Sequence, residues 1–317
     1  MRVLITGASG LTGGHLARAC VQAGDEVIGI SRSGTITDGA GEGRQLELKD
    51  APAVRELLAE VQPDVVYHLA ALSSVGRSWE EPAGTMRDNV STAVNLLEAL
   101  RCEAPRARTV WASTCEVYGP ATQLPIEETA PLRPANPYAV SKVAGDLLAK
   151  VYADAHDLPI VRARPFNHAG PGQRPIFILS SLAQQAARAR LAGARRIEIV
   201  TGNPDTRRDF TDVRDVARAY RLLAELPDSG GVYNICSGRS VSAADQVALL
   251  AEIIAPIEVQ HTVDPARVRA SEVVDLRGSA ERLHRATGWQ PEIPLRQTML
   301  DTVEWWEHEL SSEQLRN

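Results

Sequence analysis

Two side chains four residues apart, Tyr138 and Lys142, have types and a spacing that suit acid–base chemistry. Asn136 can cap a helix and Pro137 suits a first helical turn, so both side chains are expected on one face of a helix. An ammonium beside a phenol favours the phenolate, and we therefore expect Lys142 to lower the pKa of Tyr138. Such a phenol can give a proton to a carbonyl oxygen, or take one from a carbinol, while hydride moves at the carbon.

A hydroxyl for the same oxygen is predicted at Thr114, within STCEVYG at 113–119. This segment directly follows a predicted strand at 109–112, and ligands of open α/β folds bind at the carboxyl ends of strands. The spacing of Tyr138 and Lys142 is common by chance and would alone describe a surface pair on a helix. Combined with an upstream hydroxyl and a glycine-rich start of the chain, it indicates a catalytic constellation.

The chain opens with TGASGLTG at 6–13, in which glycines follow the first predicted strand with G-x-x-G-x-x-G spacing. Gly7 permits a tight turn, Gly10 lets backbone amides approach a pyrophosphate, and Gly13 lets the next helix pack closely. Unpaired amides and the positive end of the helix dipole then face the anion. The context favours a dinucleotide site over a glycine-rich turn without a ligand.

The end of the second predicted strand indicates which dinucleotide is bound. An NAD site usually has an Asp or Glu there for the ribose 2′-hydroxyl. Here the strand continues into Ser31, Arg32 and Ser33, without a carboxylate. A guanidinium with flanking hydroxyls suits a 2′-phosphate, which favours NADP(H), with NAD possible; the alternative is a solvated loop arginine.

The elements that must position these residues alternate between strand and helix in the first half of the chain. Such alternation implies right-handed crossovers and a Rossmann-type doubly wound parallel sheet covered on both faces, an α/β fold. A glycine-rich loop is expected at 33–43. Strands are predicted at 2–6, 26–30, 64–68, 109–112 and 160–163, and helices at 11–23, 51–61, 82–100 and 136–156.

After residue 165 the elements become shorter, and glycine and proline cluster at 170–175. We interpret 1–165 as a cofactor-binding domain, with returns near 209–236, and 166–317 as a smaller mixed α/β substrate-binding lobe. Helices are predicted near 178–191, 213–226, 243–254 and 295–309, and strands near 197–200 and 231–236.

The composition argues against several other classes of protein. The 317 residues carry a formal net charge of −6, which gives no electrostatic reason to expect a nucleic-acid partner. No apolar stretch approaches the 18 residues typical of a membrane span. Four cysteines without C-x-x-C spacing and seven histidines without H-x-x-x-H spacing indicate no disulfide framework and no metal site. A reducing cytoplasm is therefore the expected location.

Over nearly its whole length the chain resembles the extended short-chain dehydrogenase/reductases that act on nucleotide-diphosphate sugars. RPFNHAGPGQ and the RDFTDVRDV run most resemble GDP-4-keto-6-deoxy-mannose reductases and the related GDP-mannose 4,6-dehydratases. The motifs that carry the resemblance are TGASGLTG at 6–13, HLAA at 68–71, STCEVYG at 113–119, NPYAVSK at 136–142, RPFNHAGPGQ at 164–173, RRDFTDVRDVARAY at 207–220, YNICSG at 233–238 and TGWQPEIPL at 287–295.

The resemblance implies roles for individual residues. Tyr138 would be the general acid/base, Lys142 its partner, and Thr114 would polarise the 4-keto oxygen. Arg208 and Arg269 would hold the diphosphate of the sugar nucleotide. The other substrate contacts implied are Ser73, Ser74 and Asn167; the cofactor contacts implied are Gly7, Ser9, Gly10, Leu11, Thr12, Gly13, Arg32, Leu48, Leu69, Ala70, Ala71, Tyr138 and Lys142.

Three chemistries share this scaffold: reduction, dehydration and epimerisation. In dehydratases resembling this chain, a glutamate at the position of Glu116 acts as the base, although relatives that do not dehydrate also have it. The opening motif lacks the TGxTGQDG pattern of those dehydratases, and the segment after GPGQ lacks their RRG stretch. The prediction is NADPH-dependent reduction of the 4-keto group of a GDP-4-keto-6-deoxy-hexose. Glu116 is counted with Thr114, Tyr138 and Lys142 among the catalytic residues, either as a base or as a residue that shapes the pocket.

Alternatives remain open at this stage. A GDP-mannose 4,6-dehydratase or another nucleotide-sugar epimerase or dehydratase would use the same constellation. A non-catalytic NADP-binding regulatory protein would keep the fold, but the tyrosine, lysine and hydroxyl are all present. The resemblance also implies a homodimer in which the helices at 82–100 and 136–156 form a four-helix contact.

Overall fold

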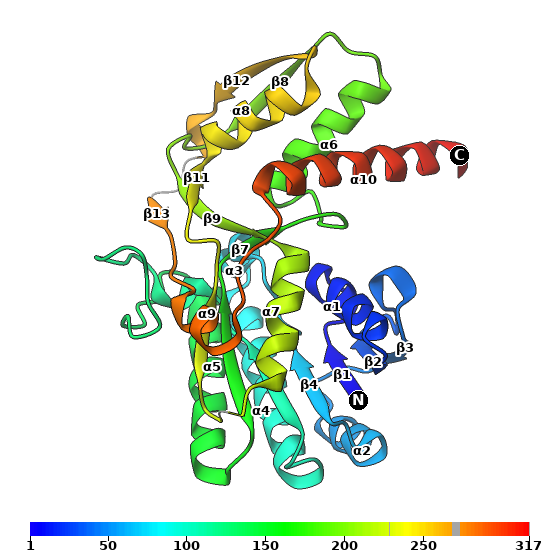
Figure 1. Cartoon of the computed structure of the whole chain (residues 1–317), viewed down its shortest axis with the longest axis vertical. Helices are drawn as coiled ribbons and strands as arrows, with labels where there is room; N and C mark the ends of the chain where they lie inside the picture. Colours follow the sequence, from blue (N-terminus) through cyan, green and yellow to red (C-terminus); the bar gives the residue numbers. More distant parts are fainter. Residues whose placement is uncertain (228, 268–272, 317) are drawn as a thin grey trace.

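The computed structural model describes residues 1–227, 229–267 and 273–316. Its larger part is built on a seven-stranded sheet with the order β10-β6-β5-β4-β1-β2-β3, in which every neighbouring pair is parallel (Figure 1). The doubly wound parallel sheet is thereby confirmed. Its strands are β1 (Arg2–Thr6), β2 (Glu26–Ser31), β3 (Glu42–Gln45), β4 (Val65–His68), β5 (Arg108–Ala112), β6 (Ile160–Pro165) and β10 (Val232–Ile235).

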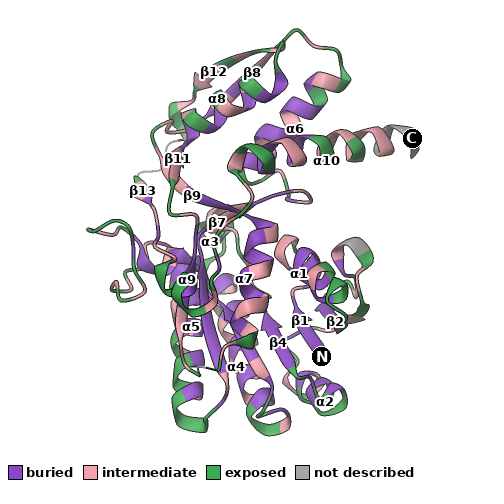
Figure 2. Cartoon of the chain, in the orientation of Figure 1, coloured by how far each residue is buried: buried purple, intermediate pink, exposed green. Residues whose placement is uncertain are grey.

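Helices cover both faces of this sheet, because its central strands are apolar on both sides. One apolar core joins the sheet to α1 (Leu11–Gln22) and α7 (Val213–Glu225). A second core joins the opposite face to α2 (Ala51–Val61), α4 (Pro82–Glu103) and α5 (Pro137–His156). Buried residues accordingly concentrate on the strands and on the inner faces of these helices (Figure 2).

The smaller part lies beyond the carboxyl ends of the strands and has its own apolar core (Figure 1). Four strands form a mixed sheet and two form a parallel pair. Its strands are β7 (Asn167–Ala169), β9 (Arg207–Asp212), β11 (Ser240–Ser242) and β13 (Asp275–Leu276) in the mixed sheet, and β8 (Arg196–Thr201) and β12 (Glu258–Val263) in the pair; its helices are α6 (Ile178–Leu191), α8 (Ala243–Ile254) and α10 (Leu295–Arg316).

The structure adds elements that the sequence pattern did not indicate. The expected loop at 33–43 contains a short 3-10 turn, η1 (Thr37–Gly39), and the start of β3. β9 escaped prediction because its sequence RRDFTD is too polar for a typical buried strand. The other unpredicted elements are short or half exposed: α3 (Val75–Glu80), α9 (Glu281–Thr287), β7, β11, β12 and β13.

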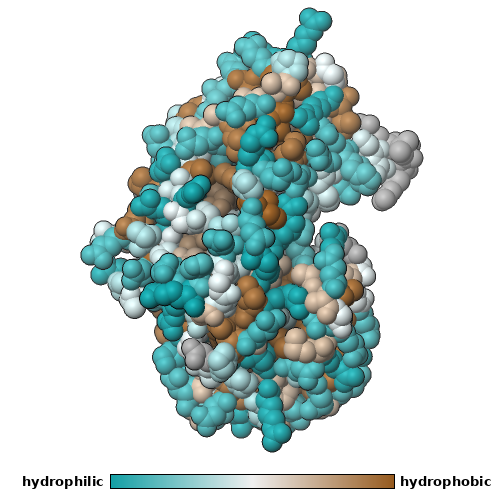
Figure 3. Space-filling model, in the orientation of Figure 1, coloured by the Kyte–Doolittle hydropathy of each residue, from teal (hydrophilic) through white to brown (hydrophobic). Residues whose placement is uncertain are grey.

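The visible surface is mostly hydrophilic, with smaller hydrophobic areas on both parts, and it is indented between them (Figure 3). Within the described ranges, no helix combines the length and apolarity needed to cross a membrane.

Candidate active site

The glycine-rich loop turns sharply between β1 and α1. Gly7 has φ +76°, and a side chain there would come within 2.9 Å of the Ala70 nitrogen. A Cβ on Gly13 would lie 2.3 Å from the Gly7 carbonyl oxygen, so the close approach expected of both glycines is present. The N-cap of α1 is Gly10, without a side-chain hydrogen bond to the first turn. Because Ser9 and Gly10 are also exposed, the first-turn amides can receive an anion such as a pyrophosphate.

The loop that follows β4 is fixed beside this turn. The Thr6 hydroxyl oxygen accepts hydrogen bonds from the backbone N–H groups of Leu69, at 3.2 Å, and Ala70, at 3.3 Å. It also lies 2.9 Å from His68 Nδ1. Burial, together with the charge of Lys142, lowers the pKa of His68 to about 3, so His68 is neutral and its ring can accept the Thr6 proton. The predicted cofactor residues Leu69, Ala70 and Ala71 therefore adjoin the glycine-rich loop.

Tyr138 and Thr114 meet at the carboxyl edge of the sheet. Asn136 caps α5 by accepting a hydrogen bond from the Ala139 N–H at 2.8 Å, and Tyr138 follows in the first turn. Thr114 lies two residues after the end of β5 (Arg108–Ala112) and caps the short 3-10 helix η2 (Cys115–Tyr118). The Thr114 side chain lies close enough to the Tyr138 phenol to influence its pKa.

The expected lowering of the Tyr138 pKa is wrong for this structure. Burial raises the pKa of Tyr138 above its usual value; a hydrogen bond with Thr114 opposes the rise, and the charge of Glu116 adds to it. Lys142 instead donates a hydrogen bond to the Ala112 carbonyl oxygen at 2.6 Å. Burial lowers the pKa of Lys142 to about 8. The phenol is consequently protonated near neutral pH, as a proton donor must be.

Glu116 also lies at this site. Its backbone N–H donates to the Thr114 hydroxyl oxygen at 3.3 Å, and its carboxylate accepts a hydrogen bond from the Asn136 side chain at 3.0 Å. Cys115, which lies between Thr114 and Glu116 in the sequence, is buried, and burial raises the pKa of its thiol well above the usual value. Cys115 is therefore a neutral thiol.

The remaining predicted cofactor residues lie around the same loop. Arg32 is exposed directly after β2. Leu11 and Thr12 are half-buried in the first turn of α1, and the Thr12 hydroxyl lies 3.0 Å from Nε2 of His168 on β7. Leu48 is only 7% exposed and packs in the core with α2 and α4, and its carbonyl oxygen accepts a hydrogen bond from the Asn95 side chain at 3.0 Å.

The predicted substrate residues have different surroundings. Ser73 is exposed, whereas the Ser74 hydroxyl caps α3 by accepting a hydrogen bond from the Arg77 N–H at 3.2 Å. Asn167 Oδ1 is buried and has no hydrogen-bond partner among the residues that the structure describes. Arg208 donates through one nitrogen to the carbonyl oxygens of Arg207 and Val273, both at 2.8 Å. Arg269 lies outside the described residues.

One buried polar network near the site was not found from the sequence. Asp146 of α5 accepts hydrogen bonds from Arg162 at 2.8 Å and from Arg164 at 2.9 and 3.0 Å. Arg164 also donates to the Tyr118 hydroxyl at 3.0 Å. Burial alone would raise the pKa of Asp146, but the hydrogen bond and charge of Arg164 and the charge of Arg162 lower it overall. The available signal was Arg162 inside the predicted buried strand at 160–163, with Arg164 directly after it, because buried charges need a partner.

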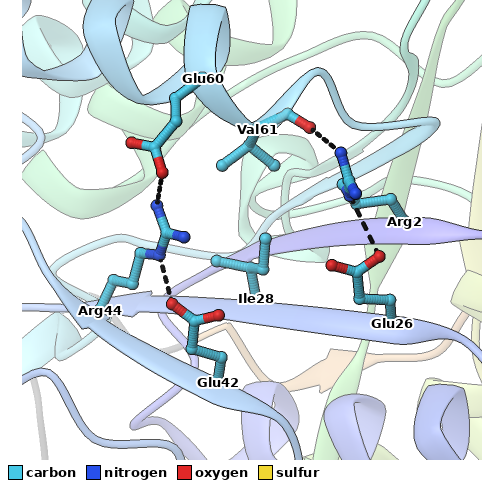
Figure 4. Close-up of a pocket in the computed structure, with 7 residues that line it drawn as sticks. All are labelled: Arg2, Glu26, Ile28, Glu42, Arg44, Glu60 and Val61. Atoms are coloured by element: carbon cyan, nitrogen blue, oxygen red, sulfur yellow. Dashed lines mark hydrogen bonds and ion pairs between the residues drawn. The ribbon is translucent and has the colours of Figure 1, made fainter.

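Another charged hollow lies at the opposite, amino-terminal edge of the sheet (Figure 4). Arg44 pairs with Glu42 at 2.6 Å and Glu60 at 2.8 Å, and Arg2 pairs with Glu26 at 3.1 Å. Because each of these charges is paired and the hollow lies at the opposite edge of the sheet from Tyr138, we interpret it as structural. Across the described ranges, the side chains that could bind a metal form no cluster of three.

Comparison with known proteins identifies this arrangement. A family model described as GDP-mannose 4,6 dehydratase matches residues 4–302. The chain is 36% identical to the GDP-6-deoxy-D-mannose reductase of Pseudomonas aeruginosa, covering 98% of this chain and 99% of that protein. It is 34% identical to the UDP-glucose 4-epimerase of Mycolicibacterium smegmatis, covering 96% and 98%. A solved structure, RMD from Pseudomonas aeruginosa complexed with NADPH, has a TM-score of 0.85 at 34% identity and covers 98% of this chain and 100% of its own.

The chain is an extended short-chain dehydrogenase/reductase of the kind that modifies nucleotide sugars. Within that class, the chain belongs to the GDP-mannose 4,6-dehydratase family.

Proposed function

We propose that this protein reduces the 4-keto group of a GDP-4-keto-6-deoxy-hexose with NADPH. The observation that carries the proposal is the placement of Tyr138, which is buried in the first turn of α5 beside Thr114 at the carboxyl edge of the sheet, as a protonated phenol. A ketone that receives hydride at carbon needs a proton at oxygen, and Tyr138 is an acid available to supply it. The bound cofactor would supply the hydride.

The residues of the chain then have defined tasks. Tyr138 gives its proton to O4 as the carbonyl becomes an alcohol, and Thr114 hydrogen-bonds that oxygen and the phenol. Lys142, fixed on the Ala112 carbonyl, places a cation near the reacting groups; with a pKa of about 8 it also exchanges protons near neutral pH. Solvent protons then restore the phenol through neighbouring polar groups.

The rest of the site supports a dinucleotide and a sugar nucleotide. The uncapped first turn of α1 suits the pyrophosphate, and the exposed Arg32 favours NADP over NAD, in keeping with the NADPH complex of the related structure. We assign Arg208 and Arg269 to the substrate diphosphate. Asn167, Ser73 and Ser74 are assigned to the sugar, and the guanine is proposed from the similarity to the mannose reductase.

A direct assay tests the proposal. Purified protein, NADPH and GDP-4-keto-6-deoxy-mannose should lose NADPH absorbance in a one-to-one ratio with the sugar reduced. If GDP-mannose alone becomes a keto sugar without net change of cofactor, the chain is a dehydratase. Tight NADP binding without turnover of any sugar nucleotide would instead indicate a non-catalytic, regulatory role.

One observation favours the dehydratase as the second candidate. Glu116 lies close enough to Tyr138 to raise its pKa, so a carboxylate base stands beside the acid. Dehydration needs such a base to remove a proton next to the ketone, whereas ketone reduction does not. Turnover of GDP-mannose by Glu116→Gln, compared with wild type, separates the two functions.

We also propose that the protein forms a homodimer through α4 and α5. Val140, Leu147 and Val151 are 42%, 47% and 56% exposed and follow one another on one face of α5. Apolar side chains at this spacing favour burial against a second copy. Leu147→Glu should convert the dimer to a monomer in light scattering; a monomeric wild type contradicts the proposal.

Two further assignments accompany the function. We place the cofactor domain at 1–165, with α7 and β10 returning to it, and the substrate lobe at 166–317. Because the four cysteines are free thiols, we propose that the protein works in a reducing cytoplasm.

A further inference from the structure

The buried side-chain amide of Asn136 makes two hydrogen bonds at the proposed active site, one to α5 and one to η2. Its Oδ1 accepts from the Ala139 N–H at 2.8 Å, and its Nδ2 donates to Glu116 Oε2 at 3.0 Å. The first bond fixes the orientation of the amide, since a helix N–H must meet an oxygen. The amino group is then forced to face an acceptor, and the Glu116 carboxylate is that acceptor.

The two bonds connect the segments that hold the acid and its hydroxyl partner. The cap sets the start of α5, where Tyr138 stands two residues after Asn136. The second bond holds Glu116, whose backbone N–H donates to the Thr114 hydroxyl oxygen at 3.3 Å. Asn136 is 9% exposed, so solvent competes little for either bond.

We propose that Asn136 is a positioning residue that sets the Glu116 carboxylate against the phenol of Tyr138, in addition to capping α5. This inference rests on the proposed function, because it assigns a task to a residue of the same site.

The titratable groups that act on the phenol come from two other elements. From η2 these are Glu116 and Cys115, and from α7 Tyr220. Lys142, on α5 itself, donates to the Ala112 carbonyl oxygen. Burial raises the pKa values of Cys115 and Tyr220, so both are neutral. Glu116 is therefore the anion beside the phenol, and moving it away should lower the pKa of Tyr138.

Asn136→Ser tests the second bond without removing the cap. Serine caps helices about as well as asparagine, but its side chain is too short to reach Glu116. We expect a thermal midpoint and a cofactor Kd close to wild type, and kcat lower by about 10- to 100-fold. The upper basic limb of the pH profile of kcat/KM, which lies above the titration of Lys142, should move to lower pH. A profile identical to wild type would overturn the proposal.

Asn136→Asp should move the same limb in the opposite direction. Aspartate keeps the cap but replaces the amino group by a second anion near the phenol, which raises the pKa of Tyr138. As a matched control, Ser242→Asn exchanges one capping residue for another on α8, away from the site, and should leave the profile unchanged.

The two proposals can fail separately. Wild type alone decides whether GDP-4-keto-6-deoxy-mannose consumes NADPH, and the variants are then compared on whichever sugar nucleotide wild type converts. A crystal structure of Asn136→Ser gives an answer without any substrate. Displacement of the Glu116 carboxylate supports the inference, and an unmoved carboxylate overturns it.

Discussion

Titratable side chains lie at both ends of the parallel sheet, but they are exposed at one end and buried at the other. At the amino-terminal end, Arg44 and its partners Glu42 and Glu60 are 30%, 58% and 66% exposed and pair with one another. At the carboxyl end, Tyr138 and Lys142 are at most 9% exposed, and burial moves the pKa of each. Water screens the first cluster, whereas desolvation shifts the pKa values of the second. The same fold therefore produces a solvated cluster and a buried one, to which we assign the chemistry.

Removing the phenol should have the largest effect and tests the reactive end directly. Tyr138→Phe should lower kcat by about 10²- to 10⁴-fold, because the acid that protonates the ketone oxygen is lost. Steady-state NADPH oxidation measures the loss, and fluorescence titration of NADPH should show nearly unchanged affinity. Undiminished turnover would reject the assigned role.

The second-largest effect is expected in the stability of the protein, when the buried network of Asp146, Arg162 and Arg164 is broken. Asp146→Ala leaves Arg162 and Arg164 without the carboxylate that they share. An uncompensated buried charge typically costs about 3–5 kcal/mol in the free energy of unfolding. Denaturant unfolding measures it; a loss below about 1 kcal/mol would show that water reaches these arginines.

The pH dependence of stability should reveal the buried lysine. The pKa of Lys142 is about 8 in the folded protein against 10.5 as its usual value, so the unfolded chain binds more protons between these values. Stability should therefore rise with pH in this window, by about 1–3 kcal/mol. Lys142→Met lacks this contribution. Melting curves from pH 7 to 9.5 should diverge between the two proteins, and parallel curves would contradict burial of the charge.

The exposed cluster should give the smallest effect. Arg44→Ala removes two surface ion pairs, which typically stabilise by about 0–1 kcal/mol each. Activity should stay at the wild-type value, and the melting temperature should change little and less at high salt. A loss comparable to that of Asp146→Ala would erase the contrast between the two ends of the sheet.

Much of the fold could be predicted because its signals are local. Parallel strands read as continuous apolar runs, and α2, α6 and α8 begin and end at the predicted residues. β9 was missed because its polar residues are buried by pairing with β7, β11 and β13, which no local pattern reveals.

The site was predicted only as far as residue types allow. Sequence spacing indicated Tyr138, Lys142 and Thr114, and the structure joins the Tyr138 and Thr114 side chains. The direction of the Tyr138 pKa shift depends on burial, which spacing does not report. The contact of Glu116 with Asn136 spans 20 residues and a change of element, so it required the tertiary structure.

The last strand of the main sheet, β10, comes from a segment made after the smaller part has begun. It pairs with β6 through residues 232–235, and α7, just before it, covers the core on one face. A nascent chain released at residue 165 would therefore carry a bare strand edge and an uncovered apolar face, both of which promote aggregation. Completion of the cofactor half thus has to wait for synthesis of about seventy further residues, and this delay makes the order of translation part of how the enzyme folds.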